Sequence, residues 1–195
     1  MAVDADTGRM QWYYQTTPGD NWDYTATQDM MLADMEVDGK MRKVIMQAPK
    51  NGFFYVLDRQ TGELLRANPY VTVNWASHVD METGRPVENP DKDFLNGESK
   101  WILPGPLGGH NWQSMSYNPN TGLVYIPALE NPLVFDVEHD FKATGRFKYI
   151  EGGWNTGVEF GRIMELLGEH PDLPKGKGYI TAFDPLTGKT HWTRE

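Results

Sequence analysis

Residues 2–12 read Ala2-Val3-Asp4-Ala5-Asp6-Thr7-Gly8-Arg9-Met10-Gln11-Trp12, and the pattern behind this stretch recurs in the chain. Four copies begin near residues 2, 56, 116 and 182, and each has an Asp or Asn followed by a Thr-Gly pair. Asp or Asn opens a type I turn, and Gly takes the left-handed conformation from which a second strand starts. A repeat of about 60 residues is typical of propellers and solenoids, and it predicts a series of β-hairpins.

The composition agrees with an all-β protein. Hydrophobic residues make up 39% of the chain and aromatic residues 12%, and the 20 Gly and 13 Pro suit a chain that turns often. Propellers usually close with four to eight blades, whereas 195 residues hold little more than three units of this length. We therefore expect residues 1–195 to be a fragment, about three to four blades, of a larger propeller.

Local patterns predict the strands, an insertion and one helix. We expect strands over 10–15, 41–48, 52–58, 113–117 and 123–128, and a long insertion over 68–108 that contains a hairpin turn at Asp80–Gly84. Phe160, Ile163, Met164 and Leu167 follow helical spacing, which indicates a short helix over 161–168.

Charge and residue usage exclude several classes of function. The formal net charge of −9 argues against nucleic acid as a partner, because phosphate binding requires a basic face. The chain has no Cys, so neither disulfides nor thiolate metal sites are possible. The longest apolar run, 123–129, is too short to span a bilayer, and Met1 leads into the first repeat without the features of a signal peptide.

Polar residues suited to chemistry gather in three segments between the repeats. The first is Pro18-Gly19-Asp20-Asn21-Trp22-Asp23-Tyr24, in which Asp20 and Asn21 suit a turn. We expect Trp22 and Tyr24 to exclude water from Asp23, and a desolvated carboxylate needs a cation or a role in proton transfer. The second is Ala48-Pro49-Lys50-Asn51-Gly52. The third is Gly108-Gly109-His110-Asn111-Trp112, where two glycines allow close approach of the backbone.

Together, these three segments and the repeats, of which the first and the fourth end in Trp, resemble the pyrroloquinoline-quinone (PQQ)-dependent alcohol dehydrogenases. The resemblance covers essentially the whole chain, insertion included. It implies an eight-bladed propeller whose blades are tied by tryptophan docking motifs. It also implies an enzyme that oxidises primary alcohols to aldehydes, with hydride transfer to the quinone.

The resemblance assigns a role to four residues of this chain. Asp23 matches the catalytic base, which also lies at the metal, and Lys50 matches the basic residue that hydrogen-bonds the quinone oxygens. Asn111 and Trp112 match an amide and an aromatic ring at the cofactor. Thr25 stands where lanthanide-dependent relatives carry an additional Asp, which favours Ca²⁺ as the metal. The family's other metal ligands, a Glu and an Asn, and its vicinal-cysteine ring have no counterpart in this sequence.

The resemblance also implies a cellular location and an electron acceptor. We expect a periplasmic protein that passes electrons to a cytochrome c-type or quinone acceptor. We also expect this segment to be inactive unless the rest of the propeller closes the ring. Two other interpretations stay open: a membrane-bound PQQ glucose or polyol dehydrogenase, and a non-catalytic propeller scaffold that keeps the docking motifs. Asp23, Lys50 and Asn111 argue against the scaffold.

Overall fold

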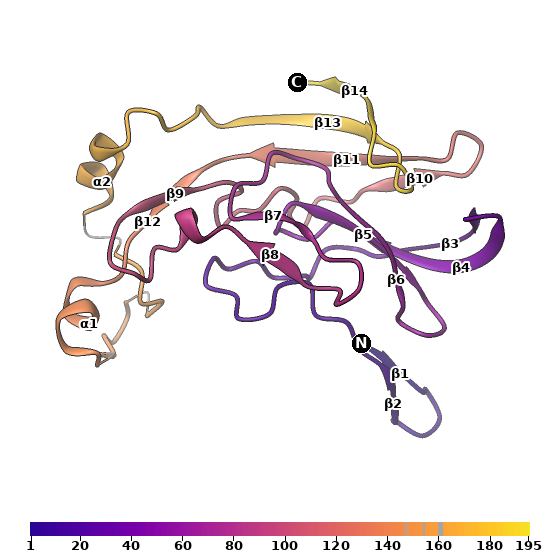
Figure 1. Ribbon diagram of the computed structural model, residues 1–195, viewed down its shortest axis with the longest axis horizontal. Coiled ribbons are helices and arrows are strands. Elements are labelled where there is room, and N and C mark those ends of the chain that lie inside the picture. The colour runs from indigo at the N-terminus through magenta and orange to yellow at the C-terminus, as the bar shows by residue number, and fades with distance from the viewer. Residues whose placement is uncertain (147, 154, 160–161) are drawn as a thin grey trace.

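The computed structural model describes residues 1–146, 148–153, 155–159 and 162–195, and most of its elements are strands (Figure 1). Two four-stranded antiparallel sheets dominate it, and in each the spatial order of the strands is their order in the chain, although β12 and both helices intervene between β11 and β13 of the second. The first sheet consists of β3 (Met31–Val37), β4 (Lys40–Gln47), β5 (Phe53–Asp58) and β6 (Leu64–Pro69). The second consists of β10 (Ser116–Asn118), β11 (Leu123–Glu130), β13 (Lys177–Phe183) and β14 (Thr190–Arg194).

Smaller elements surround these sheets. They are the β1–β2 hairpin (Ala2–Val3 and Met10–Trp12), the β7–β8 hairpin (Ala76–Val79 and Pro86–Glu88), the β9–β12 pair (Lys100–Ile102 and Leu133–Phe135), a 3₁₀ turn η1 (Pro90–Lys92), and helices α1 (His139–Thr144) and α2 (Ile163–Glu169). In the described part of the chain, neither helix has the length and apolarity that a membrane crossing requires.

The four repeat copies fall in three sheets. The copies that begin near 2 and 56 form the β1–β2 and β5–β6 turns, but those near 116 and 182 form the β10–β11 and β13–β14 turns of a single sheet. A four-stranded meander has two hairpins at one end, and either can carry the same turn. The first sheet uses Asp38-Gly39 for its other hairpin, with both residues at positive φ, as a type I′ turn requires.

Most strand predictions are confirmed within a few residues, and the predicted hairpin at Asp80–Gly84 joins β7 to β8. The insertion is more ordered than predicted, because β9 within it pairs with β12, about 30 residues later. A helix does form over 163–169, whereas Phe160 and Gly161 lie outside the described residues. Its predicted apolar face is wrong in part, since Met164 is exposed and Leu166 is buried.

Strand β5 lies between two cores, which explains why all six of its residues are buried. Successive side chains point to opposite faces of a strand. Phe54 and Val56 therefore pack in the core between the two large sheets, where the Phe54 ring lies 5.4 Å from that of Phe183. Phe53 and Tyr55 instead join an aromatic core on the other face, with Trp22, Tyr24, Trp75, Phe94 and Phe135.

The antiparallel order brings the long connections to one end of the sheets. The tight β3–β4, β5–β6, β10–β11 and β13–β14 turns lie at the other end, because hairpins alternate along a meander. Figure 1 shows α1 and α2 among the long connections, opposite the β3–β4 and β10–β11 turns. The segments between β2 and β3, β4 and β5, and β6 and β10 therefore meet at one end, and they carry Asp23, Lys50 and Asn111.

Tryptophan docking is visible where the β1–β2 hairpin meets the first large sheet. The Trp12 Nε1–H donates to the Arg59 carbonyl at 3.1 Å, and the indole lies flat on Gly62. A Cβ atom at Gly62 would lie 2.8 Å from two atoms of the ring. Tyr14 repeats this contact on the insertion, where its hydroxyl donates to the carbonyl of Gly84 at 2.6 Å. The turn glycines Gly62 and Gly84 therefore form the surfaces against which Trp12 and Tyr14 pack.

We predict that Gly62→Ala destabilises the protein more than Gly122→Ala does. Both glycines have positive φ, so each substitution carries the backbone strain of about 1–2 kcal/mol. Only Gly62 has a ring against it, whereas a Cβ at Gly122 meets nothing within 4 Å. Overpacking should add about 1–3 kcal/mol at Gly62, measured by chemical denaturation. Equal losses of stability would show that the indole contact does not matter.

Candidate active site

Asp23 and Lys50 form the centre of the site. The Lys50 ammonium lies 2.9 Å from Asp23 Oδ2 and also donates to the Asp23 backbone carbonyl at 3.1 Å. The lysine side chain is 11% exposed and the aspartate side chain 65% exposed. The Lys50 side chain is thus largely buried, and its ammonium pairs with a carboxylate that lies at the surface.

The expectation that aromatic neighbours keep water from Asp23 is wrong. Trp22 and Tyr24 are both buried, but Asp23 between them points outward. Its φ of 65° is left-handed, a conformation that Asp tolerates better than most residues. The two buried rings and the turn below them hold this residue, and its carboxylate stays accessible.

Asp20 builds the turn that presents Asp23. Its two carboxylate oxygens accept the backbone N–H groups of Trp22 at 2.9 Å and Tyr24 at 2.7 Å. Burial raises the pKa of the Asp20 carboxyl, although these hydrogen bonds act in the opposite direction. The sequence interpretation of Asp20 as a turn residue is consistent with this geometry.

The turn that carries Lys50 is held through its backbone carbonyls. Five successive carbonyls, those of residues 48–52, accept hydrogen bonds from the segment 70–110. The donors are His110 Nδ1 to Ala48 (2.9 Å), the Tyr70 hydroxyl to Pro49 (2.7 Å), Gly109 N to Lys50 (2.9 Å), Trp75 Nε1 to Asn51 (2.8 Å) and Tyr70 N to Gly52 (3.0 Å). A turn with this many buried partners cannot shift without breaking several hydrogen bonds.

The glycine pair Gly108-Gly109 packs directly on Lys50. Gly108 has φ of +82°, and a Cβ there would lie 2.7 Å from the Lys50 Cα. The prediction that these glycines allow close backbone approach is thus consistent with the structure, and the surface approached is the lysine turn. The same loop then presents Asn111, whose Nδ2 donates to the Leu107 carbonyl at 2.9 Å, and Trp112, whose side chain is 82% exposed.

The structure therefore brings some of the predicted site residues into direct contact and others only close to that contact. Asp23 and Lys50 are in direct contact, and Asn111 and Trp112 lie on the loop that covers Lys50. Thr25 follows the base loop and is exposed. Among the described residues, no group of three or more His, Cys, Asp or Glu side chains is arranged for a metal ion. The Asp20 carboxylate of the same loop is close enough to Asp23 for the Asp23 charge to help raise the Asp20 pKa, although burial is the larger cause.

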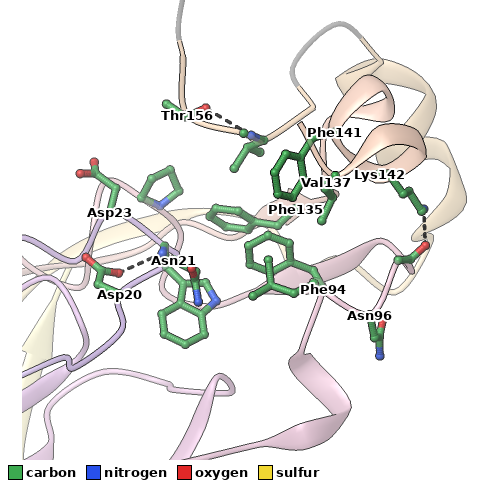
Figure 2. A pocket seen from close by; sticks show the side chains of 17 residues that line it. Asp20, Asn21, Asp23, Phe94, Asn96, Phe135, Val137, Phe141, Lys142 and Thr156 are labelled. Carbon is green, nitrogen blue, oxygen red and sulfur yellow. Dashed lines mark hydrogen bonds between the residues drawn. The ribbon is translucent and has the colours of Figure 1, made fainter. Parts of the chain in front are cut away.

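A cavity of about 1060 Å³ lies beside Asp23 (Figure 2). Asp20–Asp23 line one part of it, and the aromatic side chains of Phe94, Phe135 and Phe141 line another. Figure 2 shows Lys142 at the far side, where its ammonium donates to the carbonyl of Gly97 in the insertion. Sequence reasoning missed this cavity, because its wall combines the insertion with the connection from β11 to β13.

These groups fit a flat, anionic, oxygen-rich ligand such as a quinone carboxylate. The exposed Trp112 indole offers a face for stacking, and the Lys50 ammonium offers a charged donor for quinone oxygens. The accessible Asp23 carboxylate can supply one oxygen to a hard divalent cation.

Comparisons with known proteins agree on the family. Residues 1–86 match the PQQ family model described as the glucose/ethanol/alcohol dehydrogenase β-propeller domain. The quinohemoprotein alcohol dehydrogenase ADH IIB of Pseudomonas putida is 46% identical over 194 residues, which are 98% of this chain and 26% of that protein. The chain thus spans about a quarter of the length of the curated relatives it matches.

Solved structures give the same result for the fold. The quinohemoprotein alcohol dehydrogenase of Comamonas testosteroni superposes with a TM-score of 0.84 and 44% identity, over 99% of this chain and 28% of that one. A europium-containing methanol dehydrogenase superposes with a TM-score of 0.77 and 31% identity, over 98% of this chain and 31% of that one. The prediction of a partial all-β propeller is confirmed.

The close contact between Gly108 and the Lys50 backbone can be tested. Gly108→Ala should push the 108–112 loop away from the lysine turn, because the new Cβ has no room beside the Lys50 backbone. Amide hydrogen exchange at Gly109 should become at least tenfold faster, since its bond to the Lys50 carbonyl is lost. Gly19→Ala, also at positive φ but with open space around it, is the control. Unchanged exchange at Gly109 would contradict the packing described.

Proposed function

Because this chain is a segment of a β-propeller of the PQQ-dependent alcohol dehydrogenase family, we propose that the complete protein oxidises primary alcohols to aldehydes. The observation that carries the proposal is the contact between an accessible carboxylate, Asp23, and the ammonium of Lys50 beside an apolar cavity. A general base must lie within hydrogen-bond reach of the proton that it removes, and Asp23 lines this cavity.

Each residue has a part in this chemistry. Asp23 accepts the hydroxyl proton of the alcohol, and its carboxylate also serves as one ligand of the cation. Lys50 would donate to the quinone oxygens and stabilise negative charge that develops there. Asn111 and Trp112 would hold the cofactor's edge and face. When bound, pyrroloquinoline quinone would supply the hydride acceptor that the amino acids lack, and the cation would act as a Lewis acid.

The cavity provides a place for the carbon chain of the alcohol. Its wall of Phe94, Phe135, Phe141 and Val137 is apolar, and it reaches the loop that carries Asp23. An alkyl group that leaves water for this surface gains about 0.8 kcal/mol for each buried CH₂. This supports alcohols with an apolar tail as the substrate class.

The rest of the proposal follows from the family. We place the protein in the periplasm, with a cytochrome c-type or quinone electron acceptor, and we take Ca²⁺ as the cation because Thr25 is neutral. A membrane-bound glucose or polyol dehydrogenase is the alternative. The aromatic cavity favours the alcohol dehydrogenase, because sugars need polar partners along their length.

The base assignment predicts the outcome of Asp23→Asn in the complete enzyme. Turnover should fall by at least about a hundredfold, because a positioned general base contributes roughly that much. The fold should persist, since the Asp23 side chain is exposed. Steady-state oxidation of 1-butanol with a dye acceptor measures the effect, with Asp29→Asn, also exposed, as the control. Near-normal turnover with cofactor bound would rule out Asp23 as the base.

The metal assignment predicts the response to exchange of cations. The protein freed of metal should regain activity with Ca²⁺ and poorly with a lanthanide, because a trivalent ion needs more anionic ligands than this site offers. Thr25→Asp should shift the preference toward lanthanides, and Thr25→Asn tests the effect of shape without charge. Reconstitution of the unmodified enzyme by lanthanide alone would refute the role of Thr25.

A further inference from the structure

The Asp23–Lys50 pair joins two loops that are separate in the chain, and one residue outside both of them contacts each. Asp23 lies between β2 and β3, and Lys50 lies between β4 and β5. Trp75, in the insertion just before β7, is 1% exposed and packs against both loops. No role for this residue follows from the sequence patterns or from the chemistry proposed above.

On the base loop, Trp75 holds the two aromatic rings that flank Asp23. Its ring centroid lies 4.8 Å from that of Trp22 and 5.3 Å from that of Tyr24, and both pairs are tilted. Offset and tilted aromatic pairs are stabilising beyond the burial of their area. Asp23 has left-handed φ, and such a conformation persists only where its surroundings fix it. The Trp75 ring is a large part of those surroundings.

On the lysine turn, Trp75 acts through a hydrogen bond. Its Nε1–H donates to the Asn51 carbonyl at 2.8 Å, one residue after Lys50. Asn51 is fully buried, and its own amide donates to Thr16, Thr17 and Tyr55. Loss of the indole donor would leave a buried carbonyl without its partner, which is unfavourable and favours rearrangement of the turn.

We propose that Trp75 is a positioning residue: it fixes the Asp23 loop and the Lys50 turn relative to each other and thereby sets the geometry of the carboxylate–ammonium pair. Only the kinetic consequence of this inference rests on the proposed function. The Asp23 carboxylate and the Lys50 ammonium lie on two different loops, so a small rotation of either loop separates them. A displacement of about 1 Å at a reacting group can lower a rate by about a hundredfold.

The test is Trp75→Phe in the complete enzyme, which keeps an aromatic ring and removes the indole donor. We expect kcat for 1-butanol to fall at least about tenfold with KM within about twofold, because the substrate cavity does not include Trp75. The primary deuterium isotope effect of the alcohol should rise as the chemical step becomes slower. In the crystal structure of the variant, the Asp23 Oδ2–Lys50 Nζ distance should exceed 3.5 Å.

The matched control is Trp101→Phe in the same insertion, which removes an indole bond of equal length, 2.8 Å, to Asp172 near the surface. It should leave kcat and the ion pair unchanged. Equal kinetic losses in the two variants, or a Trp75→Phe structure that keeps the pair at 2.9 Å, would overturn the proposal. If the pair opens in Trp75→Phe but the unmodified protein oxidises no alcohol, the positioning role stands and the proposed function fails.

Discussion

The run of hydrogen bonds from the segment 70–110 to the carbonyls of residues 48–52 is the constraint on which the site depends. It ties the lysine turn to an insertion rather than to its own sheet. Because a buried carbonyl without a partner is costly, these bonds favour the packing of the segment 70–110 over the turn. Lys50 is then nearly fixed in place before any ligand arrives, which is the preorganisation that electrostatic stabilisation requires.

The two large sheets supply the platform for this arrangement. Strand β5 is buried on both faces, so it is anchored by one core between the sheets and by a second, aromatic core below the site. The second core includes the rings that flank Asp23 and extends to the cavity wall at Phe94 and Phe135. Phe94 and Phe135 therefore belong both to the aromatic core and to the wall of the cavity.

The repeated turns and the strands that flank them could be predicted from sequence, because each leaves a local pattern. The roles of Asp23, Lys50, Asn111 and Trp112 came from a resemblance of motifs, and they stay predictions. The exposure of Asp23 could not be predicted from sequence. Its left-handed backbone conformation changes the direction of the side chain, and composition gives no signal of it. The role of Trp75, the β9–β12 pair and the aromatic cavity also escaped prediction. These features depend on contacts between residues that are far apart in the chain, and no spacing rule reports such contacts. The assignment of two repeat copies to one sheet needed the observed strand order.

A crystal structure of the complete protein with pyrroloquinoline quinone and a non-oxidisable alcohol analogue tests the account most directly. We expect the quinone oxygens to lie within hydrogen-bond distance of Lys50 Nζ and Trp112 to contact the ring face. The analogue's hydroxyl should lie about 2.6–3.2 Å from a carboxylate oxygen of Asp23, with its carbon chain in the cavity lined by Phe94 and Phe135. A cofactor bound elsewhere, or a hydroxyl directed away from Asp23, would contradict it.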